Sequence, residues 1–179
     1  MEQIIKPAIV AHCDWSKDAK KRWMAVAVRD DNRWVIDLPE SVGDTADMFD
    51  RLRGRSTDQG SLFVGFDFPI GLPEEYGRAT GFSDFRAALQ GFGGEGWEDW
   101  FEVCDSADEI SIARPFYPMR PGGRKKDHLL QGLGFTLGDQ LLRRCEKKTA
   151  ERQAACSLFW TLGGNQVGKG AIAGWQEVL

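Results

Sequence analysis

The first third of the chain consists of short apolar runs separated by polar turns, a pattern typical of β-strands. Three such runs, at residues 8–14, 22–29 and 33–38, come before any helical pattern. The aspartates and asparagine at residues 30–32 are typical of a hairpin turn. In residues 22–29 both alternating faces are apolar, which indicates a central strand. We therefore expect a three-stranded antiparallel meander.

A helix and a fourth strand are predicted next. Asp44 or Thr45 can cap a helix whose apolar positions 46, 48, 49 and 52 share one face, and this helix ends near Gly54. The run at residues 62–66 then predicts a buried strand. Because a helix precedes it, we expect this strand to pair in parallel with an earlier one. The expected core is therefore a mixed sheet with the order β-β-β-α-β.

The second half of the chain predicts a helical region rich in loops. Gly163–Gly170 is expected to be a glycine-rich loop, and residues 110–126 a basic loop. No internal repeat divides the sequence, and its length suits one domain, so we expect a single α/β domain over residues 1–179. Helices are expected at residues 84–90, 97–104, 137–159 (bent near Thr149) and 171–179.

Composition narrows the class of protein. The 23 Lys and Arg against 27 Asp and Glu give a net charge of −4, which argues against a general nucleic-acid coat but permits a local basic patch. The 4 cysteines are scattered, with no Cys-x-x-Cys pair, as in a reduced cytoplasmic protein. No apolar run approaches the roughly 18 residues of a membrane span, and the N-terminus does not resemble a signal peptide. We expect a cytoplasmic protein without a membrane partner.

Two aspartates follow predicted strands. Asp14 ends the first strand and Asp67 ends the fourth, so parallel neighbours would bring both carboxylates to one sheet edge. Convergent carboxylates with open water positions suit Mg²⁺ or Mn²⁺, and such an ion can activate water and neutralise a phosphoryl group. The alternative is that each aspartate caps a loop or pairs with an arginine. The nearby Ser16 is a candidate hydrogen-bond donor to a bound phosphate.

Other candidates for binding an anion lie in the second half. The segment Gly163–Gly170 matches Gly-x-x-x-x-Gly-Lys, but a glycine stands where a phosphate-binding loop needs Ser or Thr. A milder prediction is that its glycine amides, with Asn165 and Lys169, bind an anion at a helix N-terminus; the alternative is a turn between helices. Arg114 and Arg124 in the basic loop, with neighbouring aromatic residues, suit phosphates and stacked bases, unless the loop is only a solvated surface.

One family resemblance emerges from these segments. The run at residues 65–73 (Gly-Phe-Asp-Phe-Pro-Ile-Gly-Leu-Pro), Arg78, the segment at 84–86 and the early Asp14-Trp15-Ser16 resemble the domain of unknown function 429 family, a ribonuclease H-like (RNase H-like) group without settled activity. The resemblance covers most of the chain. It implies an RNase H-like α/β fold in which Asp14 and Asp67 are metal-binding carboxylates.

The same resemblance implies a departure from the family pattern. RNase H-like nucleases usually need a third acidic residue, and no acidic residue after Asp67 lies in a matching motif. Glu146, Glu151 and Glu177 are candidates, although we expect all three on solvated helix faces. Family members tend to continue past this point with a further acidic motif, so we expect either a truncated chain or a degenerate site.

Three hypotheses of function follow. The first is an Mg²⁺- or Mn²⁺-dependent phosphodiester hydrolase in which Asp14 and Asp67 hold the ion and basic residues steady the phosphate. The second keeps the fold without catalysis and binds nucleic acid or another anionic ligand through the basic loop. The third is an actin-like or sugar-kinase-like phosphotransferase. It ranks last, because such proteins need a glycine-rich turn after the first-strand aspartate and residues 14–18 contain no glycine.

Overall fold

The computed structural model describes residues 6–56, 61–163 and 166–179, and its contacts separate the chain into two compact units. The first unit runs to Phe68 and the second begins at Pro69. We describe each unit by itself.

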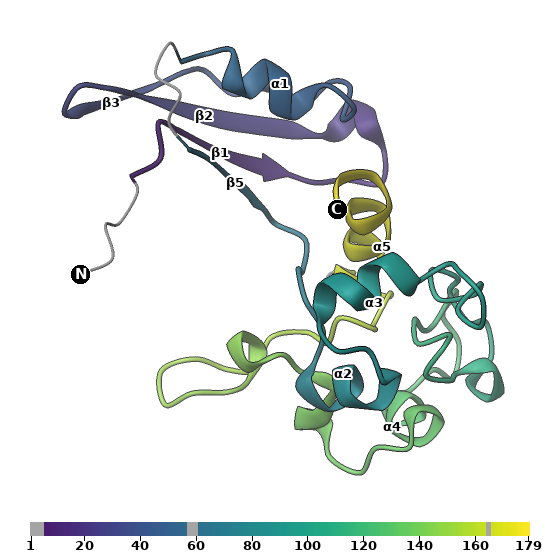
Figure 1. Ribbon diagram of the computed structural model, residues 1–179. Helices are drawn as coiled ribbons and strands as arrows, with labels where there is room; N and C mark the ends of the chain where they lie inside the picture. Colours follow the sequence, from purple (N-terminus) through teal and green to yellow (C-terminus); the bar gives the residue numbers. More distant parts are fainter. Residues whose placement is uncertain (1–5, 57–60, 164–165) are drawn as a thin grey trace. The chain divides into compact units, whose positions relative to one another are not determined.

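The first unit is a mixed sheet with one helix (Figure 1). Its strands follow the order β3-β2-β1-β5, and the short β4 also pairs with β2. The β1–β2 and β2–β3 pairs are antiparallel, whereas β1 and β5 are parallel. The expected meander and the parallel fourth strand are therefore confirmed. The bounds are β1 Ile9–Asp14, β2 Trp23–Asp30, β3 Arg33–Ile36, β4 Glu40–Ser41 and β5 Leu62–Phe66.

One face of this sheet forms the core of the first unit. Alternate residues of β1 and β2 are buried on that face, and α1 (Met48–Arg53) lies along it and buries Met48 and Leu52 (Figure 1). The helix begins later than predicted, because the Asp44 carboxylate accepts from the Ala46 amide in a local turn. The predicted central position of β2 is confirmed, because β2 lies between β1 and β3. The opposite face of the sheet is nevertheless exposed at apolar positions such as Trp23 and Trp34. β5 is likewise not buried, and Phe63 is an exposed residue within it.

The second unit consists of short helices and long ordered loops around an aromatic core (Figure 1). The Trp100 ring stacks on Phe92 and Trp175, with ring centroids 3.8 and 5.3 Å away. The Trp100 indole N–H donates to the Tyr76 hydroxyl at 2.7 Å, so the polar atoms of this core are paired. The helices are α2 Glu74–Thr80, α3 Phe85–Gly91, α4 Asp127–Leu133 and α5 Val167–Val178, with 3₁₀ turns η2 Ala107–Glu109, η3 Gly138–Leu141 and η4 Arg144–Glu146.

Two predicted helices of the second unit do not form. Residues 97–104 adopt turns, since Trp100 and Cys104 are buried in the aromatic core rather than along one helical face. Residues 137–159 contain only the two short 3₁₀ turns η3 and η4. Helix α3 is capped by the Asp84 carboxylate, which accepts from the Ala87 amide at 2.9 Å. Tertiary packing here outweighs the apolar periodicity that predicted longer helices.

Candidate functional site

The two strand-end aspartates are brought together in the first unit. The parallel register pairs Cys13 with Phe66, so Asp14 and Asp67 are the next residues of two adjacent strands. The Asp67 amide continues the ladder by donating to the Cys13 carbonyl at 3.2 Å. Both aspartates are exposed, as a site open to a ligand requires. This juxtaposition arises from the sheet topology, because parallel strands end at a common edge.

Hydrogen bonding orients one of the two carboxylates. The Trp15 backbone amide donates to Asp67 Oδ1 at 2.8 Å. The Trp15 ring is buried and makes edge contacts with Phe66 and Phe68, at centroid distances of 5.5 Å to each. The carboxylate is therefore held by the backbone of the residue that follows Asp14, and that backbone is anchored by an aromatic cluster.

The two carboxylates interact electrostatically. Partial burial raises the pKa of Asp67, and the negative charge of Asp14 together with a hydrogen bond between the two side chains raises it further. The Trp15 amide and the backbone amide of Asp67 oppose this increase in the pKa. Two adjacent carboxylates therefore favour a shared proton or a bound cation, either of which relieves their repulsion.

Cys13 and Ser16 flank this pair and differ in their chemistry. Burial, and next the charge of Asp67, raises the pKa of Cys13 to about 11, so its thiol stays neutral and does not act as a nucleophile. The Ser16 hydroxyl accepts a hydrogen bond from the Asp18 amide at 3.3 Å and is partly exposed two residues after Asp14. Ser16 is thus the predicted anion-binding residue that shares a unit with the aspartates.

A third acidic ligand does not join the pair in the described parts of the chain, where no group of three or more His, Cys, Asp or Glu side chains is arranged to hold a metal. Glu151 and Glu177 are exposed. Glu146, predicted on a solvated helix face, is instead buried, and its carboxylate accepts from Arg143 Nε at 2.9 Å and Nη2 at 2.6 Å. Its charge is therefore committed to a structural ion pair.

The donor set of the pair nevertheless suits a divalent ion. Mg²⁺ is commonly bound through one or two carboxylates, with waters and substrate phosphates completing its shell. Asp14 and Asp67 supply two hard oxygen ligands whose mutual repulsion a cation would relieve. The residues present therefore fit a weakly held Mg²⁺ or Mn²⁺ better than a closed all-protein site.

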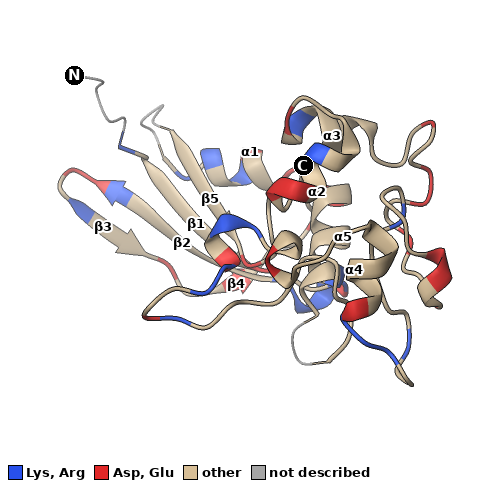
Figure 2. Ribbon diagram, turned by 90° about the horizontal axis from the view of Figure 1, so that it is seen from below, with Lys and Arg blue, Asp and Glu red and all other residues tan. Residues whose placement is uncertain are grey.

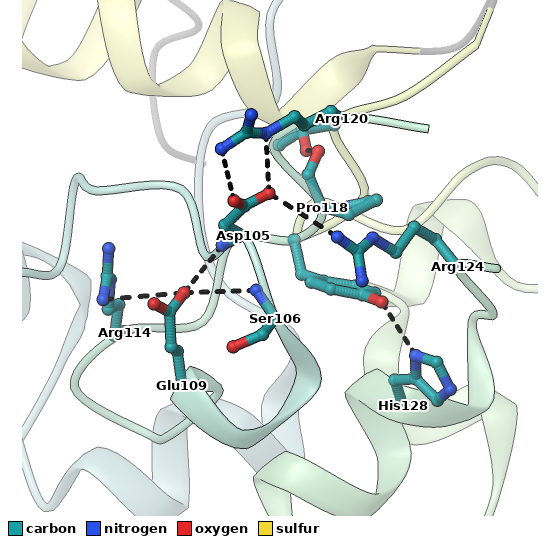
Figure 3. A network of polar contacts seen from close by, with 10 residues as sticks. Asp105, Ser106, Glu109, Arg114, Pro118, Arg120, Arg124 and His128 are labelled. Carbon is teal, nitrogen blue, oxygen red and sulfur yellow. Dashed lines mark hydrogen bonds and ion pairs between the residues drawn. The ribbon is translucent and has the colours of Figure 1, made fainter. Parts of the chain in front are cut away.

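The predicted anion-binding arginines belong to the second unit, where acidic residues hold them (Figure 3). Arg114 Nη1 lies 3.8 Å from Glu109 Oε2, and Arg124 Nη2 lies 3.6 Å from Asp105 Oδ1. The Arg120 guanidinium also donates to both oxygens of Asp105. That pairing lowers the pKa of the Asp105 carboxyl and raises that of Arg120. These positive charges are thus largely compensated within the unit.

The aromatic part of the predicted basic surface is internal. Phe116 and Tyr117 are fully buried, so neither ring lies on the surface where a base could stack. Figure 2 shows that basic and acidic positions are interspersed over the loops of the second unit. The basic loop at residues 110–126 therefore has a buried aromatic interior, and its arginines are paired with Asp105 and Glu109, which precede the loop.

The glycine-rich segment has a structural explanation. Helix α5 begins at Val167, earlier than predicted, so Gly168 and Lys169 lie in its first turn. A Cβ atom on Gly168 would lie 2.7 Å from the Leu158 carbonyl oxygen and 3.1 Å from Phe116 Cδ1. Gly168 is thus required by close packing rather than by a phosphate. Lys169 is partly exposed in the second unit, and Asn165 lies outside the described residues.

The hairpin loop expected between the first two strands forms, but its basic charge was missed from the sequence. The turn between β1 and β2, residues 15–22, carries Lys17, Lys20 and Lys21, all exposed, directly after Asp14. The buried Arg22 organises this turn: its guanidinium donates to the Ser16 carbonyl at 2.6 Å and lies 4.2 Å from the Trp15 ring centroid. The concentration of basic residues after the first strand was a signal for it.

Comparison with known proteins provides no relative for this chain, since no protein-family model, curated protein or solved structure matches it. The fold and the pair of aspartates together define a mixed α/β protein with a two-carboxylate site. Within the residues that the structure describes, no helix has the length and apolar character needed to cross a membrane.

Proposed function

We propose that this chain is an RNase H-like protein of the domain of unknown function 429 type, and that Asp14 and Asp67 hold Mg²⁺ or Mn²⁺ for phosphodiester hydrolysis. The observation that carries the proposal is the pair of coupled carboxylates at the ends of the parallel strands β1 and β5. The strand order, with the first strand between an antiparallel and a parallel neighbour, supports the fold assignment. The free cysteines are consistent with a cytoplasmic location.

The residues near the two strand ends would have distinct roles in hydrolysis. Asp14 and Asp67 would hold the ion, and the Trp15 amide would keep Asp67 oriented toward it. A bound Mg²⁺ or Mn²⁺ would supply a hydroxide nucleophile and neutralise charge on the phosphoryl group. Ser16 would donate a hydrogen bond to a phosphate oxygen, and the lysines of the β1–β2 turn would attract the anionic substrate.

Calorimetric titration of Mn²⁺ tests the site directly. We expect binding to the wild-type chain and its loss in Asp14→Asn/Asp67→Asn, because the amides retain shape but remove both charges. Asp30→Asn/Asp31→Asn is the matched control, since it removes two charges from the β2–β3 turn at the other end of β2. Asp31 has φ 51°, which Asn accommodates, so this control should fold. Absence of Mn²⁺ binding to the wild-type chain would refute the metal site.

Activity is tested on a panel of single-stranded, duplex and hybrid substrates with Mg²⁺ or Mn²⁺. Cleavage should disappear in the Asp14→Asn/Asp67→Asn variant and persist in the Asp30→Asn/Asp31→Asn control. Metal binding without cleavage of any substrate would refute the proposed hydrolysis but would still support the metal site at Asp14 and Asp67.

A second function is favoured by one observation. The described residues lack a third acidic ligand, which RNase H-like nucleases usually need. A non-catalytic module that binds nucleic acid or another phosphate-bearing ligand therefore remains the alternative proposal. It predicts salt-dependent binding of oligonucleotides that Asp14→Asn/Asp67→Asn does not weaken.

A further inference from the structure

An exposed aromatic surface lies on the same face of the sheet as the two aspartates. Residues paired across neighbouring strands share a face, and Asp14 is paired with Trp23. Val10, on the same face of β1, is paired with Phe63 of β5, and Arg29 of β2 is paired with Trp34 of β3. We call Trp23, Trp34 and Phe63, which are 50%, 45% and 63% exposed, the sheet aromatics.

The spacing of these rings follows from strand geometry. Trp23 is directly opposite Asp14, and Val10, the partner of Phe63, lies four residues along β1. Four residues of β-strand span about 13 Å. Arg29, the partner of Trp34, lies six residues along β2 from Trp23, which corresponds to about 20 Å. Trp34 and Phe63 lie on the opposite edge strands β3 and β5, three strand spacings or about 14 Å apart across the sheet. The rings are therefore spread over an open area of the sheet large enough for several nucleotides, and the carboxylates lie at one end of it.

Positive charge is concentrated at that same end. Lys17, Lys20 and Lys21 are exposed in the β1–β2 turn, and no ion pair joins them to the described residues. The Asp18 carboxylate accepts from the Lys20 amide at 3.1 Å, so the turn is ordered by its own backbone contacts as well as by Arg22. Uncompensated lysines on an ordered turn are suited to phosphate contacts.

We propose that the sheet aromatics and the lysines of the β1–β2 turn bind single-stranded nucleic acid, with bases stacked on the rings and phosphates beside the lysines. Aromatic rings on an open sheet with a basic border are the general means of binding unpaired bases. Single-stranded nucleic acid would then be the substrate class of the Asp14–Asp67 site, and in that respect the inference rests on the proposed function. A duplex keeps its bases stacked internally, so it cannot use the rings in this way.

Fluorescence anisotropy with labelled single-stranded oligonucleotides of about ten nucleotides tests the inference, in buffer containing EDTA. Trp34→Ala and Phe63→Ala should each weaken binding by roughly 5- to 150-fold, the range for loss of one stacked base. Trp34→Phe keeps a ring and should retain most of the affinity. Ile36→Ala is the matched control, because Ile36 is 74% exposed on the same face but cannot stack.

The lysines have a separate signature. Lys17→Ala/Lys20→Ala/Lys21→Ala should reduce the slope of log affinity against log salt by about 2, since each phosphate contact to a single strand contributes about 0.7. Lys125→Ala/Lys126→Ala/Lys148→Ala removes three positive charges from the second unit and should leave the slope unchanged. Loss of affinity in this second variant alone would overturn the proposal in favour of the basic loop.

Other outcomes also decide the question. Equal affinity for duplex and single strands, or no effect of Trp34→Ala and Phe63→Ala, would refute stacking on the sheet. A sedimenting dimer that Ile36→Ala and Trp34→Ala both dissociate would show that a second copy covers this face instead. Because the assay contains no divalent ion, binding here without Mn²⁺ binding would refute the proposed function alone. Mn²⁺ binding without oligonucleotide binding would refute this inference alone.

Discussion

Gly168 provides a direct test of the packing in the second unit. In Gly168→Ala, the added Cβ would lie 2.7 Å from the Leu158 carbonyl oxygen and 2.9 Å from Thr161 Cγ2. The carbonyl belongs to the backbone of a fully buried residue and cannot move away cheaply. Overpacking of this kind costs about 1–3 kcal/mol, whereas alanine gains at most about 1 kcal/mol over glycine in a helix. We expect a net loss of about 1–2 kcal/mol in the free energy of unfolding.

The matched control is Gly77→Ala in α2. A Cβ at Gly77 would have only the Leu72 Cβ as a neighbour, at 4.0 Å, so the helical preference of alanine acts alone. We expect Gly77→Ala to stabilise the chain by up to about 1 kcal/mol. The two glycine-to-alanine changes should therefore have opposite signs.

Urea unfolding, followed by far-ultraviolet circular dichroism and tryptophan fluorescence, measures both variants. For a chain of this length, each kcal/mol corresponds to about 2–4 °C in Tm, so thermal unfolding gives an independent value. If Gly168→Ala were as stable as the wild-type chain, the close approach of α5 to Leu158 would be refuted. If Gly77→Ala were strongly destabilising, the free space around position 77 in α2 would be refuted.

Three further predictions concern charged and thiol groups. Because the folded pKa of Asp67 lies above its ordinary 3.8, the folded state binds the proton more tightly, so the contribution of Asp67 to stability should decrease as pH rises from about 4. In EDTA, Asp67→Asn should become more stable relative to the wild-type chain as pH rises above about 4. Urea unfolding at a series of pH values that showed the reverse would contradict the electrostatic coupling of Asp14 and Asp67. Glu146→Ala should lower the free energy of unfolding in urea by about 3 kcal/mol, because it leaves the largely buried charge of Arg143 without a partner carboxylate. Loss of an exposed ion pair would cost under about 1 kcal/mol. Peptide mapping after brief thiol alkylation at pH 8 should find the exposed Cys145 labelled, and Cys13 protected until the chain unfolds; early labelling of Cys13 would contradict its burial.

Several features of the first unit follow from local sequence patterns. Period-two alternation and the turn at residues 30–32 predict the strands, and a helix before residues 62–66 predicts a parallel fourth strand. Strand-end positions then predict that Asp14 and Asp67 are neighbours, which the register confirms. These features can be predicted from the sequence because each depends on residues close together in the chain or on the topology of one crossover.

The second unit departs from its sequence pattern because packing between distant segments decides it. Trp97, Trp100 and Phe101 have helical spacing, yet stacking of Trp100 between Phe92 and Trp175 is satisfied by turns instead. Residues 137–159 are apolar enough for helices, but the buried pair of Arg143 and Glu146 is held in a short 3₁₀ turn. No local pattern specifies such contacts.

The candidate site shows the same division. The sequence by itself determined which residues could supply carboxylates, cations and aromatic rings. Tertiary structure alone decided that Arg114 and Arg124 are paired with acids, and that Phe116 is internal. The physical reason is that charge compensation and burial depend on neighbours distant in sequence. The alternation of apolar and polar residues, turn chemistry and strand ends depend on only a few consecutive residues.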